Sequence, residues 1–195
     1  MKVICISGAS SLSPTAVPDV RIGADSSLQR EGDPLFLPDH LGKWQAAVCP
    51  AVRICRLGTN IPLKAAQTYY DSLTLVSMLL PEGVQEPLPD IYGLMDRAFI
   101  PGKWIPYGPD RRMLSFEASL SVASRGSEPE QCSNMILPGG VPGIETAISA
   151  ISRYATLKMG DIIVLTDHRI AYSPRIDSEV TGLINGEPCL GFRIK

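Results

Sequence analysis

The chain has 195 residues, of which 45% are hydrophobic and 19% are charged, as expected for one globular domain with a substantial core. Its 18 Lys and Arg against 20 Asp and Glu give a net charge of -2 without a basic run, so neither nucleic acid nor an anionic membrane is an expected partner. Five scattered cysteines and only two histidines argue against a disulfide framework and a zinc finger.

The start of the chain and its turn-forming residues set the expected compartment and fold class. Only four apolar residues lie between Lys2 and Gly8, too few for a signal peptide or a membrane span, and we therefore expect a cytoplasmic protein. Seventeen prolines and 17 glycines favour a mainly β fold with short helices, of the α+β class, over a helical bundle.

The first third of the chain predicts two strands separated by a long connection. Residues 3–6 form a short apolar run that predicts a strand ending before Gly8. Residues 8–34 are rich in Ser, Pro, Asp and Gly, and we interpret them as a loop segment. The stretch 43–60 has apolar residues on both parities, which predicts a strand buried on both faces: Val48, Val52 and Ile54 on one parity, and Ala47, Cys49 and Ala51 on the other.

The rest of the chain adds short helices and further strands. Residues 60–70 predict a short helix, with Asn60 as its cap, and 73–80 are an unbroken apolar run that predicts a second buried strand. Residues 114–122 alternate as in a half-buried strand, and the spacing of apolar residues in 142–157 predicts a helix. Asn185-Gly186 predicts a hairpin turn within 178–194.

Several of these strings resemble one family. CPAVRICRLGTNI, residues 49–61, resembles the strand of the fumarylacetoacetate hydrolase family that reads Glu-x-Glu-Leu-Ala-Val-Val-Ile-Gly before two basic residues and a turn. Residues 156–161, Thr-Leu-Lys-Met-Gly-Asp, match the Thr-Leu-x-x-Gly-Asp signature of that family. The resemblance covers nearly the whole chain. It implies one domain over residues 1–195, a mixed β-roll or barrel of the family's C-terminal catalytic type, and a homodimer.

The resemblance also implies where an active site would lie. Active members hydrolyse, decarboxylate, hydrate or isomerise small 2-oxo acids on Mg²⁺ or Mn²⁺ that three carboxylates hold. An ungapped alignment places these ligands on Ala47, Cys49 and Met78. The His/Glu pair of the family's lid has no counterpart, because no histidine or carboxylate occurs before Pro18, which makes residues 8–34 a degenerate lid.

The family's glycine-rich substrate loop corresponds here to Asp167-His-Arg-Ile-Ala-Tyr-Ser. We therefore predict a vestigial pocket that holds no metal and no cofactor. Its expected residues are Ala47, Cys49, Met78, Gln85, Thr166, His168 and Arg169. The family also has an active-site lysine. In this chain its counterpart is either Arg97 or absent.

The preferred hypothesis is a family member without the metal-dependent catalysis, which binds a small anionic ligand or assembles with an active relative. The alternative is a divergent hydrolase or lyase of a small 2-oxo acid or acylpyruvate with altered chemistry. Such chemistry could use a Cys49–His168 pair, and a soft metal on these two residues and Met78 is a further alternative.

Two other carboxylate sets stay open: Asp71 as a displaced metal ligand, or carboxylates recruited from Glu82, Asp90 or Asp167. A cavity filled by Met78, Leu80 and Tyr172 would favour the binding protein. An open polar cleft around Cys49 and His168 would favour the altered enzyme. Basic residues near the expected pocket could form an anion site: Arg169, Arg175, Arg111, Arg112 and Lys103.

Overall fold

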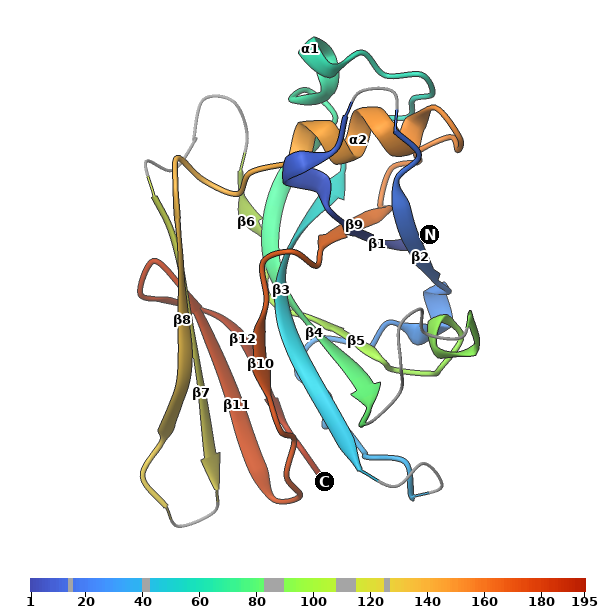
Figure 1. The fold of residues 1–195 in the computed structure, drawn as a ribbon. Coiled ribbons are helices and arrows are strands. Elements are labelled where there is room, and N and C mark those ends of the chain that lie inside the picture. The colour runs from blue at the N-terminus through green and yellow to red at the C-terminus, as the bar shows by residue number, and fades with distance from the viewer. Residues whose placement is uncertain (14–15, 40–42, 83–89, 108–114, 125–126) are drawn as a thin grey trace.

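The computed structural model describes residues 1–13, 16–39, 43–82, 90–107, 115–124 and 127–195 (Figure 1). The larger of its two sheets has eight strands. Its path runs through β2 (Asp19–Gly23), β1 (Val3–Ser7), β9 (Ile162–Leu165), β3 (Trp44–Ile54), β4 (Tyr70–Pro81) and β5 (Phe99–Pro101), while β10 (Ile170–Tyr172) pairs with β3 and β6 (Ile105–Pro106) pairs with β4. The smaller, antiparallel sheet has the order β12 (Glu187–Arg193), β11 (Ser178–Ile184), β7 (Ser115–Ser124) and β8 (Glu130–Pro138).

The helices are few and short, which confirms the predicted fold class. They are α1 (Leu63–Ala66), α2 (Ile144–Ser152) and the 3-10 turns η1 (Ala9–Ser11), η2 (Asp25–Ser27) and η4 (Asp90–Gly93). Both sheets are open over the described residues, so the expected mixed β-roll or barrel is a two-sheet roll that does not close into a barrel. In the described part of the chain, no helix has the length and apolar character needed to cross a bilayer.

The main core lies between the two sheets and beneath α2, which crosses the top of the molecule in Figure 1. Even-numbered residues of β3 face this core, among them Val48 and Val52, both fully buried. Phe116 and Leu120 of β7 reach it from the smaller sheet. The predicted alternation of β7 is confirmed, because Phe116 is buried and its neighbour Glu117 is exposed.

Odd-numbered residues of β3 face a second, separate apolar cluster on the other side of the larger sheet. Ala47, Cys49 and Ala51 pack there with Met78 of β4 and Phe99 of β5. The prediction of a strand buried on both faces is thus confirmed. Because side chains alternate along a strand, one backbone segment serves two environments.

Three local features differ from, or add to, the sequence interpretation. Residues 8–34, interpreted as a loop, contain β2, which pairs with β1 along its whole length. Residues 131–136, which resemble the closing Ser-Asp-Met-Ile turn of the fumarylacetoacetate hydrolase family, lie in β8. Helix α1 follows Pro62 without a side-chain cap, so Asn60 does not cap it. The hairpin is confirmed, since Asn185 and Gly186 have the positive φ angles of 49° and 82° that a type I′ turn requires.

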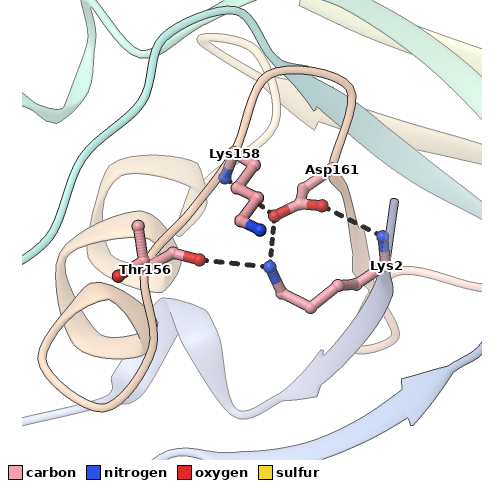
Figure 2. Close-up of polar contacts among 4 residues, drawn as sticks. All are labelled: Lys2, Thr156, Lys158 and Asp161. Carbon is pink, nitrogen blue, oxygen red and sulfur yellow. Dashed lines mark hydrogen bonds and ion pairs between the residues drawn. The ribbon is translucent and has the colours of Figure 1, made fainter.

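A buried carboxylate ties the start of the chain to the Thr-Leu-x-x-Gly-Asp segment (Figure 2). Asp161 is 0% exposed, and its Oδ1 accepts a hydrogen bond from the Lys2 backbone N–H at 3.0 Å. Its Oδ2 accepts from Lys2 Nζ at 2.5 Å and from the Lys158 backbone N–H at 2.9 Å. The next residue, Ile162, donates its N–H to the Lys2 carbonyl at 2.9 Å. These bonds fix β1 beside β9.

We expect Asp161→Asn to lower the free energy of unfolding by about 3–5 kcal/mol, because it leaves the Lys2 ammonium uncompensated and turns one acceptor into a donor facing other donors. Urea denaturation measures the change. Asp177→Asn removes a carboxylate from an exposed residue and is the matched control. Equal effects of the two substitutions would contradict the role of Asp161.

Gly102 allows the larger sheet to approach β12 closely. Its N–H donates to the Leu75 carbonyl at 2.9 Å, and the Lys103 N–H donates to the Cys189 carbonyl at 2.7 Å. A Cβ at Gly102 would lie 2.4 Å from that same Cys189 oxygen. The position therefore has no room for a side chain.

Gly102→Ala should lower the free energy of unfolding by about 1–3 kcal/mol, because the added methyl group forces two backbone segments apart. Thermal and chemical denaturation both report this change. In Gly191→Ala the new Cβ meets no atom within 4 Å, so this variant should stay close to the parent protein. A Gly102→Ala protein as stable as the Gly191→Ala protein would show that the backbone relaxes at no cost.

Candidate functional site

The second face of the larger sheet carries a cavity of about 460 Å³. Four strands and the turn after β9 contribute its lining. The lining residues are Cys5 and Ser7 of β1, Asp19 and Arg21 of β2, Ala47 and Cys49 of β3, Met78 and Leu80 of β4, and Thr166, Asp167 and Arg169 of the turn. The volume falls in the range that small organic ligands occupy in proteins.

Strand register explains why these residues meet. In the antiparallel pair of β1 and β2, Cys5 lies opposite Arg21 and Ser7 lies opposite Asp19. In the pair of β3 and β4, Ala47 lies opposite Met78. Residues two positions apart on a strand share a face, so the other lining residues of each strand join these pairs on one side of the sheet.

The floor of the cavity is apolar. Cys5, Ala47, Cys49 and Met78 are all at least nine-tenths buried and belong to the second apolar cluster. The β4–β5 pairing places Phe99 opposite Met78 and continues that cluster. Each of these four side chains is at most 8% exposed, so the cavity reaches very little of their surface.

The rim of the cavity carries the charges. Asp19 Oδ2 accepts a hydrogen bond from Ser7 Oγ at 2.9 Å, and Asp167 Oδ1 accepts one from the Gly8 N–H at 2.5 Å. Arg21 has an interaction of its own within the protein. Arg169 is exposed and has no hydrogen bond or ion pair with any residue that the structure describes. Its guanidinium group is thus available to a ligand.

The two thiols of the floor are unreactive at neutral pH. Burial raises the pKa of Cys49 to about 12; Cys5 and Asp167 also raise it, and Arg169 lowers it by less than burial does. Burial likewise raises the pKa of Cys5 to about 12, against a smaller opposing effect of Arg21. Because only a thiolate is a strong nucleophile, neither residue is prepared for nucleophilic attack.

Five of the predicted pocket residues line this cavity: Ala47, Cys49, Met78, Thr166 and Arg169. His168 does not line it, and its Nε2 lies 3.3 Å from the hydroxyl oxygen of Ser10 in η1. The structure therefore does not bring together the Cys49–His168 pair that nucleophilic catalysis would need. Gln85 lies outside the described residues.

Other residues considered from the sequence lie elsewhere. Tyr172 pairs with Ala46 and its hydroxyl hydrogen-bonds with Ser77 Oγ at 2.8 Å on the main-core side, so it does not fill the cavity. Asp71 accepts a hydrogen bond from Ser72 Oγ at 2.8 Å, at the opposite end of β4 from Met78. Arg97 lines a different cavity of about 490 Å³.

Sequence reasoning missed four lining residues: Cys5, Ser7, Asp19 and Arg21. The first two carried a signal, because they share one parity of a predicted strand. Asp19 and Arg21 carried almost none, since they alternate with Val20 and Ile22 over only five residues at a sheet edge. Val20 and Ile22 are both more than a third exposed. The strand therefore has no buried apolar face that the sequence pattern could reveal.

The donor atoms in the cavity do not fit Mg²⁺ or Mn²⁺, the metals that the family resemblance implies. Ala47, Cys49 and Met78 offer no oxygen ligand, whereas these hard cations require several. The two carboxylates of the cavity, on Asp19 and Asp167, already accept hydrogen bonds. Over the described ranges, no three or more His, Cys, Asp and Glu side chains are arranged to hold a metal ion.

The two buried thiols make the free energy of unfolding depend on pH in the alkaline range. Their folded pKa of about 12 lies above the ordinary value of 9.0, so their contribution is complete below pH 9.0 and is lost as the pH rises toward 12. Over that interval each thiol should lower the unfolding free energy by about 1.4 kcal/mol per pH unit. Urea denaturation across this range, compared with a Cys5→Ala/Cys49→Ala protein, should show a shallower slope in the variant. Identical slopes in the parent protein and the variant would refute the raised pKa values of Cys5 and Cys49.

Comparison with known proteins supports the fold at low sequence identity. No protein-family model and no curated protein matches the sequence. Fumarylpyruvate hydrolase from Pseudomonas aeruginosa, solved with Mn²⁺ and pyruvate, matches at a TM-score of 0.78 and 17% identity, over 100% of this chain and 89% of that one.

Two further solved structures agree with this match. A fumarylacetoacetate hydrolase family protein from Yersinia pestis matches at a TM-score of 0.79 and 18% identity, over 100% of this chain and 92% of the other. The 2-hydroxyhepta-2,4-diene-1,7-dioate isomerase from Mycobacterium marinum matches at 0.80 and 17% identity, over 99% and 73%. The chain therefore has the fold of the fumarylacetoacetate hydrolase family.

Proposed function

We propose that this protein binds a small organic anion in the cavity on the second face of its larger sheet and does not carry out Mg²⁺- or Mn²⁺-dependent catalysis. Two observations carry the proposal: Arg169 has no partner among the residues that the structure describes, and the floor beside it lacks oxygen ligands. The fold supplies the cavity, and the side chains that line the cavity decide its chemistry.

Charge complementarity supports an anionic ligand. The carboxylates of Asp19 and Asp167 accept hydrogen bonds from Ser7 and Gly8, which orient them and leave their negative charge unchanged. A guanidinium group donates two parallel hydrogen bonds to a carboxylate, and Arg169 has no competing partner among the described residues. Binding through a charged hydrogen bond needs no metal bridge.

The floor supports binding over catalysis. In a metal-dependent reaction of an oxo acid, the cation holds the oxo group and stabilises the enolate. Ala47, Cys49 and Met78 hold no hard cation, and the pKa of about 12 keeps the Cys49 thiol protonated at neutral pH. The site thus retains a group for binding and lacks groups for reaction.

One observation favours a second candidate, a divergent hydrolase or lyase of a small 2-oxo acid. The cavity is open, with a volume of about 460 Å³, instead of being filled by side chains. The Mn²⁺- and pyruvate-containing hydrolase of similar fold makes pyruvate a suitable first ligand for both candidates. The two candidates differ in whether the bound acid is consumed.

Calorimetric titration of pyruvate and other small carboxylates, in the presence of EDTA, tests the proposal. We expect saturable binding that Arg169→Gln weakens about ten- to a hundredfold, because the variant removes one charged hydrogen-bond donor. Arg175→Gln is the matched control, since Arg175 is also exposed but does not line the cavity.

Three results would contradict the proposal. Binding that appears only after Mg²⁺ or Mn²⁺ is added would show that the cavity recruits oxygen ligands after all. Turnover of an acylpyruvate or oxaloacetate, followed by absorbance, would establish the second candidate. Equal effects of Arg169→Gln and Arg175→Gln would move the anion site away from the cavity.

A further inference from the structure

A second cavity, of about 490 Å³, lies where the segment around η2 runs beside the residues that precede β5. The Arg97 N–H donates to the Ser26 carbonyl at 3.4 Å, and the Gln29 N–H donates to the Phe99 carbonyl at 2.8 Å. These bonds hold the two segments together, and both contribute to the lining. The cavity shares no lining residue with the one described above, so what it binds does not depend on the proposed function.

Four charged side chains of this lining lack partners. They are two guanidinium groups, on Arg30 and Arg97, and two carboxylates, on Asp33 and Asp96. Asp33 is half-buried and the other three residues are exposed, so a ligand can reach all four. No ion pair or hydrogen bond involves any of these charged groups over the described ranges. Their charges sum to zero, which favours a ligand that carries one charge of each sign over a simple anion or cation.

Gln29 lies in the wall of the same cavity and carries a buried acceptor without a donor. The residue is 3% exposed, and its Nε2 donates to the Asp33 carbonyl at 2.6 Å. This bond fixes the orientation of the amide, and Oε1 has no hydrogen-bond partner in the described part of the chain. An uncompensated carbonyl dipole in a wall of low dielectric constant attracts positive charge. The positive end of a ligand therefore belongs beside Gln29 and Asp33.

The backbone holds Arg97 in an unfavourable conformation. Its φ angle is 58°, in the left-handed region that a residue with a Cβ rarely adopts. Such a conformation persists only where neighbouring contacts enforce it, and here the bond from the Arg97 N–H to Ser26 contributes. The exposed guanidinium group can donate two parallel hydrogen bonds to a carboxylate. The negative end of a ligand therefore belongs on Arg97.

We propose that this cavity binds a zwitterion with a primary ammonium group, of which a free α-amino acid is the simplest member. The ligand carboxylate accepts hydrogen bonds from Arg97 and Arg30. The ammonium group donates to the Asp33 carboxylate, and the carbonyl dipole of Gln29 adds to the attraction. Each charge of the ligand thus meets a charge that the described protein leaves unpaired.

Titration of the isotope-labelled full chain with L-alanine, followed by amide NMR spectroscopy, tests the proposal. The backbone N–H signals of Gln29 and Arg97 should shift in a saturable manner. Propionate lacks the ammonium group and ethylamine lacks the carboxylate, so each should bind about tenfold more weakly than alanine. Glycine betaine keeps both charges but has no N–H donor, and it should also bind more weakly than alanine.

Two substitutions separate the two ends of the ligand. Asp33→Asn should weaken the binding of L-alanine about tenfold and should not weaken propionate, whereas Arg97→Gln should weaken both. Asp39→Asn and Arg175→Gln are the matched controls, since both residues are exposed and neither lines this cavity. Circular dichroism confirms that the variants fold.

The proposal fails if L-alanine causes no saturable shift, or if it shifts only amides far from Gln29 and Arg97. Propionate that binds as tightly as alanine would show that the cavity takes a simple anion, and betaine that does so would refute the primary ammonium group. Equal effects of the site variants and the controls would refute the assigned contacts. None of these results affects the anion site at Arg169, because the two cavities have no residue in common.

Discussion

The architecture depends on a strand that is buried on both faces. Even-numbered residues of β3 pack in the main core between the sheets, and odd-numbered residues form the floor of the cavity. Since side chains alternate strictly, a slip of one residue would place Val48 in the cavity and Cys49 in the core. The packing energy of the main core therefore also fixes the residues that a ligand meets on the other side.

This arrangement separates the stability of the fold from the chemistry of the site. Three carboxylates on the buried floor would repel one another and would require a cation to offset their desolvation. Ala47, Cys49 and Met78 carry no charge at neutral pH and pack as ordinary apolar groups with Phe99. The pairing of β3 with β4 therefore needs no cation at this floor. For this reason, the fold alone does not imply the reaction.

The alignment to the resembled family placed Ala47, Cys49 and Met78 at one site, and the alternation of the strand put Ala47 and Cys49 on the same face. Sequence reasoning failed where a position depends on pairing that no local pattern reveals. The main-core placement of Tyr172 follows from the register of β10 on β3. Likewise, the contribution of Arg21 follows from the pairing of β2 with β1. In β2, charged and apolar residues alternate at an exposed edge, which resembles a polar loop in composition.

The balance of forces on Cys49 shows which kind of chemistry the cavity supports. Arg169 favours the thiolate, and burial, Cys5 and Asp167 favour the thiol. Burial has the largest effect, so the positive charge of Arg169 is not neutralised by a thiolate at neutral pH. Among the described residues Arg169 also has no ion-pair partner, so its charge stays available at the rim of the cavity.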